Sequence, residues 1–245
     1  MKTLALDLPW GRLTGLDAEG AGTPVLFLHG TGCDAADWAG VVRRLPSGLR
    51  AVCVDFRGHG GSDAPAEPFT LADLASDVLA LLAHLHIEAA LLVGHSLGGM
   101  VAMAAAARSP QVAGLILLEG WTSLGVVGHA FEAGPHFYGG LPPPAIAEIK
   151  AKRAIMQARF PPAVWTPFWN SVEAYDAWPY LAGARIPILE VYGDAYLRQG
   201  TREVLRIPDN PAIVLHWIKG AGHYLPHERP EEVAALVRDF GRCAR

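Results

Sequence analysis

Cysteine is scarce in this sequence. The 245 residues include three cysteines, Cys33, Cys53 and Cys243. An odd count without paired spacing excludes a disulfide framework and offers no zinc-ligand pattern. We therefore expect no bound metal and a reducing compartment, the cytoplasm.

Long apolar runs and long basic runs are also missing. No stretch reaches the roughly 18 consecutive apolar residues that suggest a membrane-spanning helix, so we expect none. The apolar start of the chain is interrupted by Asp7 and Pro9 and is too short for the core of a signal peptide. A net charge of −4 without a basic cluster argues against nucleic acid or an anionic membrane surface as a partner.

The sequence does contain enough apolar material for a large core. Hydrophobic residues make up 51% of the chain and charged residues 18%, which is typical of a globular fold. Apolar runs alternate with segments of helical periodicity. This predicts an α/β fold with a mostly parallel central sheet and helices on both faces. The expected strands include 25–28, 49–55, 112–118, 186–192 and 212–218, and the expected helices 34–45, 71–85, 201–207 and 231–242.

The alternation stops between residues 121 and 183. This stretch is rich in proline and holds four of the seven tryptophans. Residues 145–160 are its clearest helical segment. We interpret 121–183 as a cap, or lid, inserted between two strands, so that residues 1–120 and 184–245 form the core.

A Gly-x-Ser-x-Gly turn, Gly94-His95-Ser96-Leu97-Gly98, lies between an apolar strand and an alanine-rich helix. This order predicts a nucleophile elbow, in which a serine stands on a strained strand-to-helix turn. The flanking glycines lack a Cβ, which lets strand and helix approach each other. The Leu97 N–H lies at the helix start, where it can donate to an oxyanion.

Four motifs together give the chain a family resemblance. They are Phe27-Leu28-His29-Gly30, Asp55-Phe56-Arg57-Gly58-His59-Gly60-Gly61-Ser62, the elbow, and Gly222-His223 ahead of Pro230. The chain resembles the α/β-hydrolase superfamily, most closely its small serine esterases and methyl-ester carboxylesterases. The resemblance implies that Ser96 is the nucleophile, His223 its base, and the N–H groups of Leu97 and Thr31 the oxyanion hole. It also implies that no cofactor is needed.

The acid of the triad has two candidates. Relatives usually carry it as Gly-x-x-Asp after the strand that follows the cap, but here the position three after Gly193 is Tyr196. Asp194 is near that position and two residues early. Other relatives carry the acid before the cap, where this chain has Glu119 at the end of an apolar run. We favour Glu119, because an unpaired carboxylate there would be costly, and keep Asp194 as the alternative.

The cap is expected to shape the substrate pocket. Its aromatic residues indicate an apolar site, and we place His29, Gly30, Trp121, Trp165 and Trp169 in the pocket. Four cationic side chains, Lys150, Lys152, Arg153 and Arg159, could hold a substrate carboxylate. A solvated helix face is the commoner reason for such a cluster. The other histidines, among them His129 and His136, belong to no recognisable pattern.

The predicted function is hydrolysis of small to medium apolar carboxylic esters, with a small-molecule ester as partner. A lactonase, a carbon–carbon bond hydrolase or a cofactor-free perhydrolase would use the same three groups. A different class, a non-catalytic ligand-binding protein on the same scaffold, is the remaining alternative.

Overall fold

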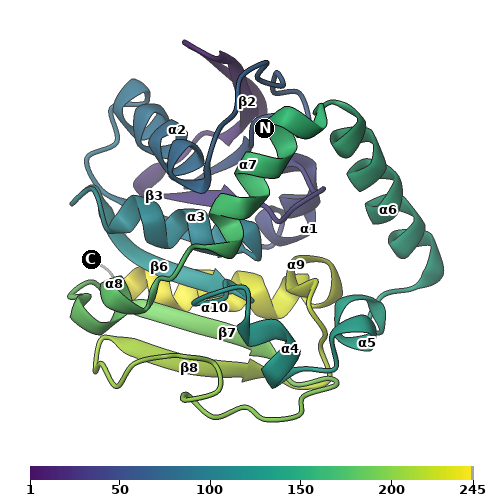
Figure 1. Cartoon of the computed structure of the whole chain (residues 1–245). Helices are drawn as coiled ribbons and strands as arrows, with labels where there is room; N and C mark the ends of the chain where they lie inside the picture. The colour runs from purple at the N-terminus through teal and green to yellow at the C-terminus, as the bar shows by residue number, and fades with distance from the viewer. Residues whose placement is uncertain (244–245) are drawn as a thin grey trace.

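A computed structural model describes residues 1–243 of the chain. Its centre is one sheet of eight strands in the order β1-β2-β4-β3-β5-β6-β7-β8 (Figure 1). Strands β1 and β2 are antiparallel to their neighbours, and the other strands are parallel to one another. The predicted mostly parallel sheet is thus confirmed. The strands are β1 Lys2–Leu8, β2 Gly11–Ala18, β3 Ala21–Leu28, β4 Leu49–Asp55, β5 Ala90–His95, β6 Val112–Leu118, β7 Ile188–Gly193 and β8 Ile213–Ile218.

Helices cover both faces of the sheet. Alternate residues of β3 point to opposite sides: Leu26 and Leu28 pack with helices α2 and α3, whereas Val25 and Phe27 pack with α1 and α10. This two-sided burial explains why the central strands are apolar at every position. The core helices are η1 Ala35–Trp38, α1 Ala39–Val42, α2 Leu71–His84, α3 Leu97–Ala106, α9 Leu225–Glu228 and α10 Pro230–Cys243.

Two helix predictions differ from the structure. The helix expected over 34–45 is a 3₁₀ turn followed by the four-residue α1, and Pro46 disfavours helical backbone at Leu45. The helix expected over 201–207 is a series of turns. Arg206 has φ of 55°, a left-handed conformation that ends a helical segment. By contrast, the helix expected over 71–85 is present as α2, and a capping box between Thr70 and Asp73 marks its start.

The segment between β6 and β7 contains the cap, which we define as residues 121–183. It is helical: α4 Val126–Ala130, α5 Ala133–Tyr138, α6 Pro143–Ala158, α7 Pro162–Glu173 and α8 Trp178–Gly183. Figure 1 shows α5 and α6 along one side of the sheet and α7 in front of the α2–α3 layer. Helix α7 docks through Phe168, which stacks on Phe69 with ring centroids 4.7 Å apart. Within the described residues, no helix is both long and apolar enough to cross a membrane.

Candidate active site

Ser96 occupies the predicted strained turn between β5 and α3. Its backbone has φ of 53° and ψ of −119°, a conformation that non-glycine residues rarely adopt. The flanking glycines are sterically required: a Cβ on Gly94 would lie 2.3 Å from the Gly98 oxygen, and one on Gly98 would lie 2.0 Å from the Leu28 oxygen. The Ser96 N–H donates to the Leu118 carbonyl at 3.0 Å, which ties the turn to β6.

The Ser96 side of the sheet carries a cavity of about 120 Å³. A larger cavity of about 290 Å³ lies near the amino ends of the central strands, but its lining contains no histidine that could activate a hydroxyl group. Since ligands of parallel sheets bind at the carboxyl ends of the strands, we assign the site by its chemistry and not by its size. The smaller cavity is lined by Gly30, Thr31, His95, Ser96, Trp121, Leu124, Phe137, Arg153, Trp169, His223 and Tyr224.

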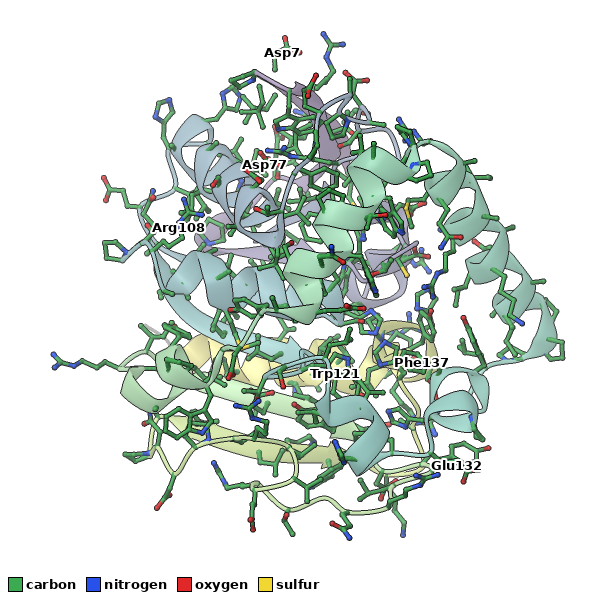
Figure 2. All side chains as sticks on the ribbon, viewed as in Figure 1. Asp7, Asp77, Arg108, Trp121, Glu132 and Phe137 are labelled. Carbon is green, nitrogen blue, oxygen red and sulfur yellow. The ribbon has the colours of Figure 1, made fainter. Side chains whose placement is uncertain are left out.

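His223 is held in this cavity by aromatic contacts on two sides. Its ring lies nearly parallel to Trp121, at 5.6 Å and 10°, and 4.4 Å from the Phe137 ring. Trp121 and Phe137 are labelled in Figure 2. Burial holds the pKa of His223 well below its usual value, so the ring is neutral and can accept a proton. Among the described residues no hydrogen bond joins His223 to Ser96; both line the cavity.

His95, the residue before Ser96, also lines the cavity. Its Nε2 is 2.9 Å from the His223 carbonyl oxygen, and its ring packs 4.8 Å from the His223 ring. Burial lowers the pKa of His95 to about 3, so the neutral ring donates from Nε2 and fixes the His223 backbone. His95 also faces Gly30, where a Cβ would lie 2.9 Å from the His95 Nδ1.

Of the two candidate acids, the structure brings Glu119 to His223. Glu119 is fully buried and follows β6 directly. Its Oε2 lies 3.4 Å from the His223 Nδ1, and its Oε1 accepts a hydrogen bond from the Gly193 N–H at 2.8 Å. Asp194 instead accepts from the Gly220 N–H at 2.5 Å. No hydrogen bond or ion pair connects Asp194 with His223 in the described part of the chain.

His136, from helix α5 of the cap, is a second histidine on Glu119. Its Nε2 lies 3.0 Å from the same oxygen, Oε2, that faces His223, and its Nδ1 lies 2.9 Å from the Ala195 carbonyl oxygen. The His136 carbonyl in turn accepts from the His223 N–H at 2.9 Å. No motif or spacing singles out His136, because the contact exists only once the cap has folded over the strand ends.

The acid and its second histidine share charge in a buried environment. Burial raises the pKa of Glu119 to about 7, against the hydrogen bond from His136. Burial alone would lower the pKa of His136, but the hydrogen bond and charge of Glu119 outweigh it, and this pKa is raised. Both ring nitrogens of His136 face acceptor oxygens, so the pair is an ion pair or shares one proton.

The same three side chains are of the types that can also coordinate a metal ion. Glu119, His136 and His223 offer ligand atoms within 4.8 Å of one another. However, the Glu119 oxygens already accept from Gly193 and from the two histidines, and the Nδ1 of His136 is directed to Ala195. These hydrogen bonds therefore correspond to proton sharing between a carboxylate and two imidazoles.

One of the two oxyanion-hole candidates, Thr31, lines the cavity next to Gly30. Leu97 is not among the lining residues. It follows Ser96 as the first residue of α3, where a backbone N–H has no partner within the helix. A side chain on Gly30 would crowd the site, because its Cβ would lie 3.1 Å from the Ser96 Cβ.

Two predicted pocket residues are absent from the cavity lining. His29 is buried, with its Nε2 accepting from the Phe56 N–H at 3.1 Å and its Nδ1 2.8 Å from the Gly30 oxygen. It thus holds the loop that carries Thr31. Trp165 stacks on Phe160 within the cap. The other predicted pocket residues, Gly30, Trp121 and Trp169, do line the cavity.

The fold and this cluster at the strand ends define an α/β hydrolase. The sequence model of the Alpha/beta hydrolase family matches residues 25–236, and the chain belongs to that family. Family membership supports a hydrolytic activity in general terms.

The individual proteins that the chain resembles share between 23% and 38% of their aligned residues with it. The chain is 29% identical over 196 residues to RutD of Azorhizobium caulinodans, to which a carbamate hydrolase activity is ascribed; the match covers 71% of this chain and 73% of that one. It is 38% identical over 99 residues, 40% of the chain, to an uncharacterized protein of Mycobacterium tuberculosis, of whose length the match spans only 29%. Among solved structures, a thermophilic esterase from Thermogutta terrifontis matches with a TM-score of 0.75 and 23% identity. The superposition covers 100% of this chain and 99% of that one, and at this identity it shows the shared fold.

Proposed function

We propose that this protein is a serine esterase that hydrolyses small carboxylic esters. The observation that carries the proposal is Ser96 on a strained elbow, in one cavity with the neutral His223, whose Nδ1 faces the buried Glu119. A serine hydroxyl needs such a base to become nucleophilic at neutral pH.

The proposed reaction has two matching steps. His223 removes the proton from the Ser96 hydroxyl as its oxygen attacks the ester carbonyl. The N–H groups of Leu97 and Thr31 hold the oxyanion. His223 then protonates the leaving alcohol, and water releases the acid from Ser96 in the same way. Glu119 orients His223 and stabilises the imidazolium that forms in each step.

The cavity size supports small substrates. Its volume of about 120 Å³ is below the ~300–1,000 Å³ of sites that enclose drug-sized ligands. Its aromatic walls, including Trp121, Trp169 and Phe137, favour an apolar portion next to the carbonyl.

The proposal is tested by replacing the nucleophile. Ser96→Ala should lower kcat/KM for 4-nitrophenyl acetate by about 10³-fold or more, and should abolish labelling by a fluorophosphonate probe. A series of 4-nitrophenyl esters from acetate to decanoate should show highest kcat/KM at the short end. Unchanged turnover in Ser96→Ala, or no labelling of the wild-type protein, would favour the non-catalytic alternative.

A further inference from the structure

Four cationic side chains lie on α6 and directly after it. Two of them form ion pairs or hydrogen bonds with residues of the core. The Lys152 Nζ lies 2.9 Å from the Asp37 carboxylate and 3.2 Å from that of Asp34. Arg159 donates to the carbonyl oxygens of Ser62 at 2.6 Å and Gly58 at 3.1 Å. These two residues fasten the helix to loops of the core.

A third cation, Lys150, lies on the surface of α6. It is exposed, and its Nζ lies 5.1 Å from the centre of the Tyr138 ring. A cation above an aromatic face at this distance is a common surface arrangement. Lys150 is not part of the cavity lining.

Arg153 is the cation that lines the Ser96 cavity. It is half-buried. Across residues 1–243, no hydrogen bond or ion pair from another side chain or carbonyl reaches its guanidinium, unlike those of Lys152 and Arg159. A partly desolvated charge without a partner is unfavourable by itself. Because Arg153 lines the cavity, a negatively charged group of a bound ligand could pair with its guanidinium.

The position of Arg153 is fixed by a close approach of backbones. Gly32 has φ of 78°, and a Cβ on it would lie 2.7 Å from the Arg153 Cβ. Helix α6 therefore rests at Arg153 on the loop that carries Thr31, an oxyanion-hole candidate. The base of the Arg153 side chain thus lies against Gly32, the neighbour in sequence of Thr31.

We propose that Arg153 binds a carboxylate on the substrate, so that the preferred substrates are small esters bearing one free carboxylate. This inference rests on the proposed esterase function. A single guanidinium matches a single carboxylate in charge, and its planar donors can hold both oxygens at once. The other cavity-lining side chains that can donate hydrogen bonds, such as Thr31 and Tyr224, carry no permanent positive charge.

The test compares charged and uncharged esters of equal size. One pair places the charge on the acyl side: the 4-nitrophenyl monoester of adipate and the 4-nitrophenyl ester of an uncharged branched acid of the same length. The other pair places it on the alcohol side: the acetate esters of 4-hydroxybenzoate and of 4-hydroxyacetophenone. For each pair, the ratio of the two kcat/KM values is measured after subtraction of spontaneous hydrolysis.

In at least one pair, Arg153→Gln should lower the charged-to-uncharged ratio by about ten- to hundredfold, the usual effect of one charge-assisted hydrogen bond. Arg153→Lys should give an intermediate ratio. The matched control Lys150→Gln removes the same charge from the same helix and should leave the ratio within about twofold. An unchanged ratio in both pairs, or an equal change in Lys150→Gln, overturns the proposal.

Binding without turnover separates this inference from the esterase proposal. Calorimetry with adipate is carried out on Ser96→Ala and on the double variant Ser96→Ala/Arg153→Gln. Weaker adipate binding in the double variant, by about tenfold, supports the carboxylate site even if no ester is hydrolysed. Ester hydrolysis that depends on Ser96, together with equal adipate binding in both variants, leaves the esterase function standing and rejects the carboxylate site.

Discussion

Ser96, Glu119 and His223 follow strands of the sheet, whereas two further residues of the site come from helices of the cap. His136 contacts Glu119, and Arg153 lines the cavity. Within the first group, Ser96 and Glu119 are held by the backbone of neighbouring strands. Ser96 is tied to the carbonyl of Leu118, and Glu119 to the Gly193 N–H. The second group depends on side-chain contacts and on how the cap docks.

We expect the core residues and the cap residues of the site to play different parts, because they are held in different ways. Backbone-held groups at strand ends are positioned with little freedom, which suits the proposed proton transfer between Ser96 and His223. Groups on the cap act on charge: His136 on the charge of Glu119, and Arg153 on that of the substrate. We therefore expect substitutions in the core to reduce the reaction itself, and substitutions in the cap to change its pH range or selectivity.

The largest contrast within the core lies between the two candidate acids. Glu119→Gln should lower kcat/KM for a chromogenic ester by about 10²- to 10⁴-fold, because His223 loses the charge that stabilises its imidazolium. Asp194→Asn removes a carboxylate that binds the Gly220 N–H and should cost less than about tenfold. Circular dichroism of both variants checks the fold. A severe loss in Asp194→Asn with near-normal Glu119→Gln would reverse the assignment.

The sequence predicts the core half of the site far better than the cap half. The elbow and the residues at strand ends follow from local rules, because strand, turn and helix are adjacent in the chain and their spacing is visible. His136 is not visible in this way: it meets Glu119 only through the fold of α5, across 17 positions of sequence. Likewise, the sequence shows four cations on α6 and directly after it, but only the folded structure shows that Arg153 lines the cavity while Lys152 and Arg159 bind the core.

A second contrast compares glycines in the two regions. Gly98→Ala should destabilise the protein by about 3 kcal/mol or more, since its Cβ would lie 2.0 Å from the Leu28 carbonyl oxygen. In the cap, a Cβ on Gly128 in α4 meets nothing within 4 Å. Gly128→Ala should be neutral or stabilising by up to about 1 kcal/mol, because alanine favours helix. Urea denaturation measures both. Similar stability of the two variants would contradict the steric reason for the elbow glycine.

The smallest expected effect concerns the cap histidine that binds Glu119, and it should appear as a change in pH dependence. Besides His136, the groups that face Glu119 are His223 and the Gly193 N–H, and Glu228 acts on it from further away. His136 lowers the pKa of Glu119 from the high value that burial imposes, and its charge also lowers the pKa of His223. The proposed reaction needs Glu119 ionised and His223 neutral.

His136→Gln should therefore raise both pKa values and move the acid limb of the kcat/KM profile to higher pH. We expect a loss of about three- to tenfold near pH 6 that largely disappears near pH 9. His129→Gln, which alters an exposed histidine of the cap, is the matched control and should leave the profile unchanged. A loss of the same size at every pH would mean that His136 only supports the packing of α5, and an acid limb moved to lower pH would show that His136 does not stabilise the charge on Glu119.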